Sequence, residues 1–223
     1  MKKLIYEEKL HWRLSIYVLG IFFVALGGAL SINSALGVSP LNALPYVLSR
    51  ITGFYIGMCF FALLAVFMLL QIIILRKDFK WIQTTQLLGA FLFGYLLDFA
   101  RLILGDFSLP TYFGQLALLL IGIAFIAKGV MLFTSVRLVP LPLEGLVAAI
   151  LKKLPNEKFH RVMITISIVC VILSIVLSLV FLGGLYGVHE GTVLAAVLTG
   201  KMMPAAKRAA KPLLDKAGIV PTE

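Results

Sequence analysis

The sequence predicts an all-α integral membrane protein with about six transmembrane helices, arranged as two inverted-topology repeats of three. Its composition, the positions of its basic residues and an internal repeat support this. Of its 223 residues, 61% are hydrophobic and 13% are charged, and the mean hydropathy is +1.05. Soluble domains carry about 45–50% apolar and about 25% charged residues, so we expect residues 1–223 to form a single membrane domain in lipid.

Five stretches approach the length of about 20 apolar residues that crosses the hydrocarbon of a bilayer. They lie near residues 14–33, 54–75, 84–103, 113–133 and 161–182. A sixth stretch, "EGTVLAAVLTGKMM" at about 190–203, is only marginally long enough. The sequence therefore predicts five clear spans and one short one.

The basic residues predict that both termini are cytoplasmic. Most of the 20 Lys and Arg residues precede span one, lie between spans two and three or four and five, or follow span six. Six crossings place all of these segments on one side, as the positive-inside rule requires. Five crossings would put the basic tail, residues 204–223, on the opposite side, so we predict six.

An internal repeat relates the two halves of the chain. "GIFFVALGGALSINSALGVSPLNAL", which starts at Gly20, aligns without a gap with "GIAFIAKGVMLFTSVRLVPLPLEGL", which starts at Gly122. The repeats cover about 14–103 and about 113–203. Because each contains three crossings, the second enters the membrane from the opposite side. Secondary transporters share this architecture and bind substrate at the repeat interface, between interrupted helices.

Each repeat contains a short helix that starts at a proline. Pro40 and Pro142 disfavour helix in the residue before them, which predicts new helices at about 40–51 and 142–153, too short to span. Gly37, Pro40 and Pro142 are the structural breaks. Each short helix is either re-entrant or interfacial. A re-entrant helix would direct its N-terminal N–H groups towards an anion or carbonyl oxygen, and the matched polar residues Asn42 and Glu144 favour this placement.

Ionisable residues within or beside the spans are candidates for function, because such groups are costly in lipid unless they are paired. Asp98 and Arg101 are three residues apart and therefore lie on one helical face. They form either a structural pair or an ion-binding pair. Lys128 either extends its amine to the headgroups or acts as a counter-ion. Glu144 follows the second proline break, where it could pair with Lys128 or Arg137, or bind a cation or proton.

Three polar residues fall in the interruption after the first span. Asn33, Ser39 and Asn42 either satisfy freed backbone groups or contact a ligand. The predicted substrate- or ion-binding residues are therefore Asn33, Ser39, Asn42, Asp98, Arg101, Lys128 and Glu144.

Short motifs carry a family resemblance. "LGVSPLNALPYVLSRITG", Leu36 to Gly53, resembles the YczE/YitT-type bacterial polytopic membrane proteins. "GTVLAAVLTG", at Gly191–Gly200, resembles the closing span of that group, and "FGYLLD", which ends at Asp98, resembles its counterpart in the first repeat. The second repeat departs from the pattern, with "RLVPLP" where Gly and Ser are expected. The resemblance implies a bacterial inner-membrane protein and names no substrate.

The motifs argue against several function classes. We find no nucleophile–base pair, paired-His metal motif or phosphate loop, so we expect no catalytic activity, cofactor or metal. The basic residues lie in loops rather than on one aromatic-rich face, which argues against nucleic-acid binding.

The leading hypothesis is a small secondary transporter or permease for a polar or charged small solute or ion. Its partners would be the lipid bilayer and that solute, and it could assemble as a homodimer. A substrate-binding subunit of a multi-component importer, with an ATPase module as partner, is the alternative. A non-transport membrane scaffold or regulator is the third reading.

Overall fold

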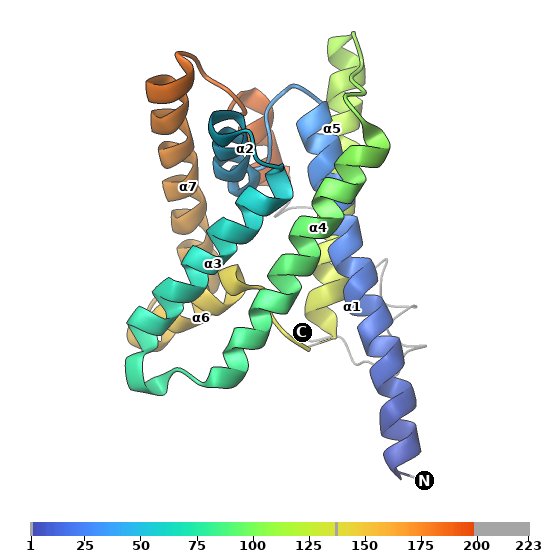
Figure 1. Ribbon diagram of the computed structural model, residues 1–223, viewed down its shortest axis with the longest axis vertical. Coiled ribbons are helices and arrows are strands. Elements are labelled where there is room, and N and C mark those ends of the chain that lie inside the picture. The colour runs from blue at the N-terminus through green and yellow to red at the C-terminus, as the bar shows by residue number, and fades with distance from the viewer. Residues whose placement is uncertain (1, 137, 199–223) are drawn as a thin grey trace.

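The computed structural model describes residues 2–136 and 138–198, with side chains from residue 10 onward. These residues form helices and connecting loops and contain no strand, which confirms the all-α prediction (Figure 1). The helices in chain order are α1 (Lys2–Asn33), α2 (Pro40–Thr52), α3 (Ile56–Leu75), the 3-10 turns η1 (Arg76–Asp78) and η2 (Trp81–Thr85), α4 (Gln86–Leu104), α5 (Tyr112–Ser135), α6 (Pro142–Lys153) and α7 (Phe159–Leu182).

Five of the described helices are long and apolar enough to cross a membrane. They are α1 from Leu10 onward, α3, α4, α5 and α7, and they match the five clear spans of the sequence prediction. Residues 190–198 are also helical. Residues 199–203 and the basic tail, 204–223, lie outside the described residues, so the sixth crossing stays a prediction.

The two short helices begin at Pro40 and Pro142, as predicted. Proline suits the first turn of a helix, where an N–H would have no partner within the helix. In Figure 1, α2 lies at the upper end of the long helices and α6 at the lower end, and successive long helices run in alternate directions. The two proline breaks therefore lie at opposite ends of the bundle.

Helices α1 and α5 cross through two pairs of glycines. A methyl group on Gly129 would lie 2.5 Å from the carbonyl oxygen of Gly20, and one on Gly122 would lie 2.8 Å from the carbonyl oxygen of Gly27. The rings of Phe23 and a phenylalanine on α5 meet edge to face, with centroids 5.5 Å apart. Small residues let the backbones approach closely, which is how helices associate in lipid, where apolar burial supplies little.

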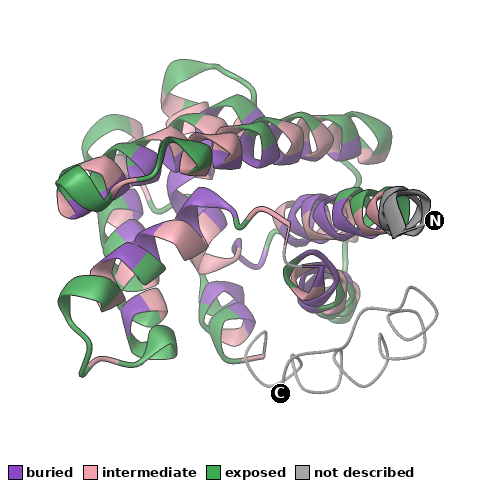
Figure 2. Ribbon diagram, turned by 90° about the horizontal axis from the view of Figure 1, so that it is seen from below, coloured by how far each residue is buried: buried purple, intermediate pink, exposed green. Residues whose placement is uncertain are grey.

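Helix α7 is the least buried of the five candidate spans. It packs mainly against α2 and, to a lesser extent, α6, so the two short helices hold it in place. Figure 2 shows buried residues on the faces that the helices turn towards one another and exposed residues on the outer faces. The outward-facing side chains of α7 include Ile168, Ile172 and Val180, which suit contact with lipid.

The segment between α1 and α2 is bound to the segment that follows α7. Val38 N–H donates to the carbonyl oxygen of Gly187 at 2.9 Å, and Gly191 N–H donates to that of Leu36 at 2.8 Å. Gly37 has a φ of 109°, and a methyl group there would lie 2.7 Å from Thr192 Oγ1. The predicted break at Gly37 is thus a position where both the backbone angle and the close approach favour glycine.

Candidate functional site: an inner polar cluster

Polar side chains from four helices meet beside the start of α6. Gln71 of α3 and Gln86 of α4 are buried, and Gln71 Nε2 donates to Gln86 Oε1 at 3.2 Å and to the carbonyl oxygen of Pro142 at 2.8 Å. A methyl group on Gly145 would lie 2.5 Å from Gln86 Oε1 and 2.6 Å from Gln71 Oε1. Glycine therefore lets both amides reach the backbone of α6.

Tyr17 of α1 approaches the same region. Its hydroxyl would lie 2.5 Å from a methyl group on Gly89 of α4, and Tyr17 is close enough to Glu144 of α6 for the two side chains to interact electrostatically. We call Tyr17, Gln71, Gln86 and Glu144 the inner polar cluster. They come from α1, α3, α4 and α6, so the helical packing, rather than any local sequence motif, assembles it.

Three buried oxygens of this cluster have no hydrogen-bond partner in the described part of the chain. They are Tyr17 Oη, Gln71 Oε1 and Glu144 Oε2. Leaving a buried polar atom unpaired costs about 1–3 kcal/mol, so most such atoms in proteins have a partner. Three in one region provide acceptors with which a polar ligand, a proton or water would pair.

The carboxyl group of Glu144 is the ionisable member of the cluster. Glu144 lies on α6, between two candidate spans, and is partly exposed as a residue, although its Oε2 atom is enclosed. Burial raises the pKa of Glu144 to about 7, against the opposing effect of hydrogen bonds from the backbone N–H groups of Glu144 and Leu141. A carboxyl with this pKa exchanges protons near neutral pH.

The chemistry of the inner polar cluster suits a proton, a monovalent cation or a small solute that donates hydrogen bonds. Amide, carboxyl and hydroxyl oxygens can all accept. Among the described residues, no group of three or more His, Cys, Asp or Glu side chains could hold a metal ion. Because the donors are amide, carboxyl and hydroxyl oxygens rather than imidazole or thiolate, the cluster favours small, weakly charged ligands over a transition metal.

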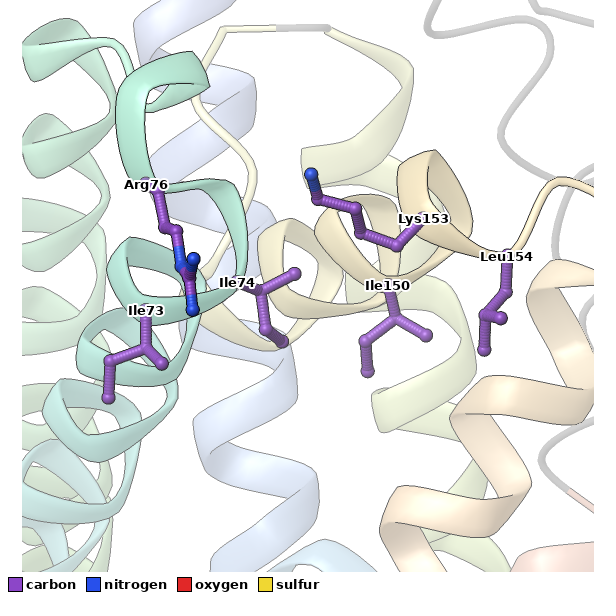
Figure 3. A pocket seen from close by; sticks show the side chains of 6 residues that line it. All are labelled: Ile73, Ile74, Arg76, Ile150, Lys153 and Leu154. Atoms are coloured by element: carbon purple, nitrogen blue, oxygen red, sulfur yellow. The ribbon is translucent and has the colours of Figure 1, made fainter.

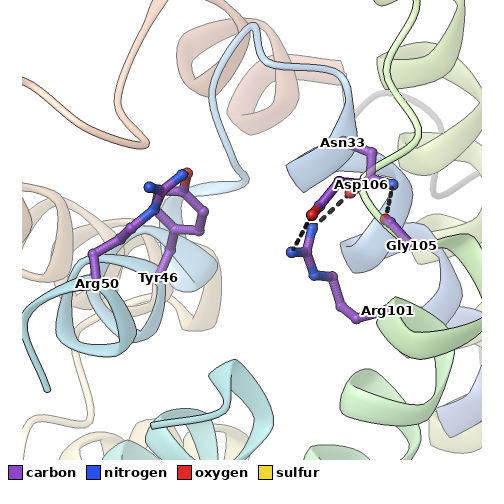
Figure 4. A network of polar contacts seen from close by, with 6 residues as sticks. All are labelled: Asn33, Tyr46, Arg50, Arg101, Gly105 and Asp106. Carbon is purple, nitrogen blue, oxygen red and sulfur yellow. Dashed lines mark hydrogen bonds and ion pairs between the residues drawn. The ribbon is translucent and has the colours of Figure 1, made fainter. Parts of the chain in front are cut away.

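An outer polar network lies at the opposite end of the bundle. Arg101 Nη1 of α4 donates to Asn33 Oδ1 at 2.6 Å, and Asn33 Nδ2, at the end of α1, donates to the carbonyl oxygen of Gly105 at 2.9 Å (Figure 4). Arg101 Nη2 also lies 3.4 Å from Asp106 Oδ1. Asn33, Arg101, Gly105 and Asp106 form this network, which ties the end of α1 to the end of α4.

Asp98 has a different neighbour from the one that its spacing suggests. Its Oδ1 accepts a hydrogen bond from the N–H of Gly57 at 2.7 Å, in the first turn of α3. The N-terminal N–H groups of a helix lack partners within the helix, and a carboxylate there is favoured by the dipole. Among the described residues, Arg101 forms its ion pair with Asp106 rather than with Asp98.

The other predicted site residues are dispersed. Lys128 is exposed on α5, with Nζ 5.3 Å from the centre of the Phe23 ring. Ser39 precedes α2, and its carbonyl oxygen accepts from the N–H of Asn42. The buried Asn42 side chain lies against Gly28 of α1.

The structure thus brings Asn33 to Arg101, and it places Glu144 among residues that the sequence analysis did not select. Gln71 and Gln86 could have been noticed as lone amides at the ends of apolar spans, whereas Tyr17 carries no comparable signal. Arg137 lies outside the described residues.

The outer polar network yields a first prediction. Arg101→Leu should lower the free energy of unfolding by about 1–3 kcal/mol, because the buried Asn33 would lose its charged donor. Asp106→Asn should change it by less than about 1 kcal/mol, because the side chain of Asp106 is 99% exposed and surface ion pairs contribute little. Thermal unfolding of both variants in one detergent tests this. Equal losses would contradict the assignment.

Comparison with known proteins places the chain in a family. The chain belongs to a family of unknown function, DUF6198, whose model matches residues 11–208. It is also similar to a Bacillus subtilis (strain 168) protein described as "Uncharacterized membrane protein YczE", with 29% identity over 199 residues, 88% of this chain and 86% of the relative. The predicted resemblance to YczE-type membrane proteins is therefore confirmed. No solved structure matches the chain.

Proposed function

We propose that this protein is a small secondary transporter or permease that moves a polar or charged small solute across the bacterial inner membrane, with both termini in the cytoplasm. The observation that carries the proposal is the inner polar cluster, where three of the five buried, unpartnered side-chain oxygens of the described residues come together. A purely structural protein gains nothing from such atoms, because apolar side chains of similar shape would pack there at lower cost.

The glycine contacts support an inverted repeat as the framework. The alignment of the repeats matches Gly20 with Gly122 and Gly27 with Gly129. When each residue is replaced by its partner in the alignment, the contact between Gly20 and Gly129 becomes the contact between Gly122 and Gly27, which the structure also contains. A pair of contacts that exchange in this way is what a two-fold axis between antiparallel α1 and α5 would produce, and such axes relate the halves of many transporters.

The positions of the proline breaks support two sites of access. The inner polar cluster adjoins the α6 break, and the outer polar network lies near the α2 break, at the other end of the bundle. In this proposal the solute passes between the breaks, Glu144 holds it at the inner end, and Asn42 lies on its route.

Transport by purified protein tests the proposal. In proteoliposomes carrying a pH-sensitive dye, small amines, amino acids and monovalent cations are offered in turn. We expect at least one of them to be taken up faster than in protein-free vesicles. Glu144→Gln combined with Gln71→Leu should slow that uptake by about tenfold, the effect of losing about 1.4 kcal/mol of interaction with the solute.

Glu157→Gln is the matched control, since this glutamate pairs with Arg161 at the surface and lies outside the inner polar cluster. It should transport like the wild type. Uptake that the double variant leaves intact while it remains folded would count against the proposed site, and no uptake of any probe would count against transport itself.

A further inference from the structure

A surface cavity lies between the C-terminal ends of α3 and α6, apart from the inner polar cluster. Its volume is about 490 Å³. Figure 3 shows the side chains that line it, which are Ile73, Ile74, Arg76, Ile150, Lys153 and Leu154. The cavity therefore combines four aliphatic side chains with two cations.

Two of the four aliphatic side chains are largely exposed. Ile73 is 63% exposed and Leu154 is 55% exposed, although burial of either would stabilise an ordinary soluble fold. Ile73 lies on a candidate membrane span, and Leu154 directly follows α6. We therefore expect acyl chains to fill this hollow when the protein lies in a bilayer.

The two cations of the cavity have no ion pair within the described part of the chain. The neighbouring Lys152 pairs with Asp78, with Nζ and Oδ2 2.9 Å apart, whereas Arg76 and Lys153 appear in none of the ion pairs formed there. Lys153 also interacts electrostatically with Asp78. One acidic side chain beside Arg76, Lys152 and Lys153 leaves a net positive charge next to the apolar hollow, which favours an anionic amphiphile by charge complementarity.

The backbone at Arg76 is itself unusual. Its φ of 47° is positive, which is rare for a residue other than glycine. Figure 3 shows the Arg76 side chain running beside Ile73 and Ile74. The exposed guanidinium thus lies beside the aliphatic part of the cavity, in a position to pair with an anionic headgroup.

We propose that this cavity binds an anionic phospholipid of the leaflet that faces the basic loops. The phosphate group lies between Arg76 and Lys153, and the acyl chains lie on Ile73, Ile74, Ile150 and Leu154. The positive-inside rule assigns this end of the bundle to the cytoplasm, where anionic lipids attract basic segments. The lipid would then link α3 to α6 and steady the start of the α6–α7 connection.

Lipid titration of the purified full chain, followed by native mass spectrometry, tests the proposal. We expect dioleoyl-phosphatidylglycerol to bind more than about tenfold more tightly than dioleoyl-phosphatidylcholine. Arg76→Gln with Lys153→Gln should reduce this preference by at least tenfold, since a cation near an anionic lipid surface contributes about fivefold in affinity. Lys77→Gln with Lys158→Gln removes the same charge from the same end, outside the cavity, and should retain the preference.

Three outcomes would overturn the site. Equal loss in the two double variants would show that general surface charge attracts the lipid. Inorganic phosphate that displaces the phosphatidylglycerol at low millimolar concentration would show a free-anion site. No preference between the two lipids in the wild type would show that the cavity does not recognise charge. A third variant, Ile150→Trp, keeps both cations and fills the cavity, and it should weaken binding of the anionic lipid in a folded chain.

Discussion

Gly27→Ala is expected to lower the free energy of unfolding by about 3 kcal/mol. A methyl group on Gly27 would collide with the carbonyl oxygen of Gly122 and would lie 2.8 Å from the backbone nitrogen of Ile126. Backbone atoms cannot rotate away as a side chain can, so α1 and α5 would have to separate along their crossing. Overpacking of a core costs about 1–3 kcal/mol, and this site should lie at the upper limit.

Two further variants sharpen the test of this crossing. Gly122→Ala should cost about as much as Gly27→Ala, and the double variant should cost less than the sum, because both act on one contact. Gly184→Ala is the control, since the nearest atom to its added methyl group lies at 3.4 Å. The measurement is thermal unfolding in detergent, followed by circular dichroism. A Gly27→Ala variant that melts like the Gly184→Ala variant would contradict the close crossing.

Local chain chemistry explains which parts of the fold could be predicted. Pro40 and Pro142 fix the first residues of the short helices because the pyrrolidine ring determines φ and removes an N–H. The long helices follow from apolar length alone. These features depend on residues close together in the chain, and they agree with the structure.

The contacts of the candidate site could not be predicted in the same way. Asp98 binds the backbone N–H of Gly57, and Gln71 binds the backbone carbonyl of Pro142. Backbone groups are present at nearly every position, so the sequence gives no sign of which one a side chain will meet. The spacing of Asp98 and Arg101 correctly places both on α4, but the orientation of α3 and α1 decides their partners.

Helix α6 connects the two proposals. Its N-terminal end contributes Glu144 to the inner polar cluster, and its C-terminal end contributes Ile150 and Lys153 to the lipid cavity. A 12-residue helix with a ligand at each end can respond to either one as a unit. Under the two proposals, binding of the anionic lipid would hold α6 in place at the end opposite Glu144.

The stability of the wild-type protein is expected to fall as pH rises from about 4.5 to about 7, because of Glu144. Burial raises the pKa of Glu144 in the folded protein to about 7, from the ordinary value of 4.5 that it has in the unfolded chain. Below pH 4.5 the carboxyl is protonated in both the folded and the unfolded state, so Glu144 does not change the free energy of unfolding. As pH rises, the unfolded state releases its proton first. Glu144 then lowers the free energy of unfolding by about 3 kcal/mol near pH 7, and this loss stays constant at higher pH.

Glu144→Gln should abolish this part of the pH dependence, because an amide does not titrate, and the variant should equal or exceed the wild type in stability at pH 8. Glu157→Gln removes a surface carboxyl and should keep the wild-type slope. Melting temperatures of the three proteins at pH 5, 6, 7 and 8 in one detergent provide the measurement. A Glu144→Gln variant with the wild-type slope would show that the carboxyl is already ionised in the folded protein, and the inner polar cluster would then have to hold a compensating cation.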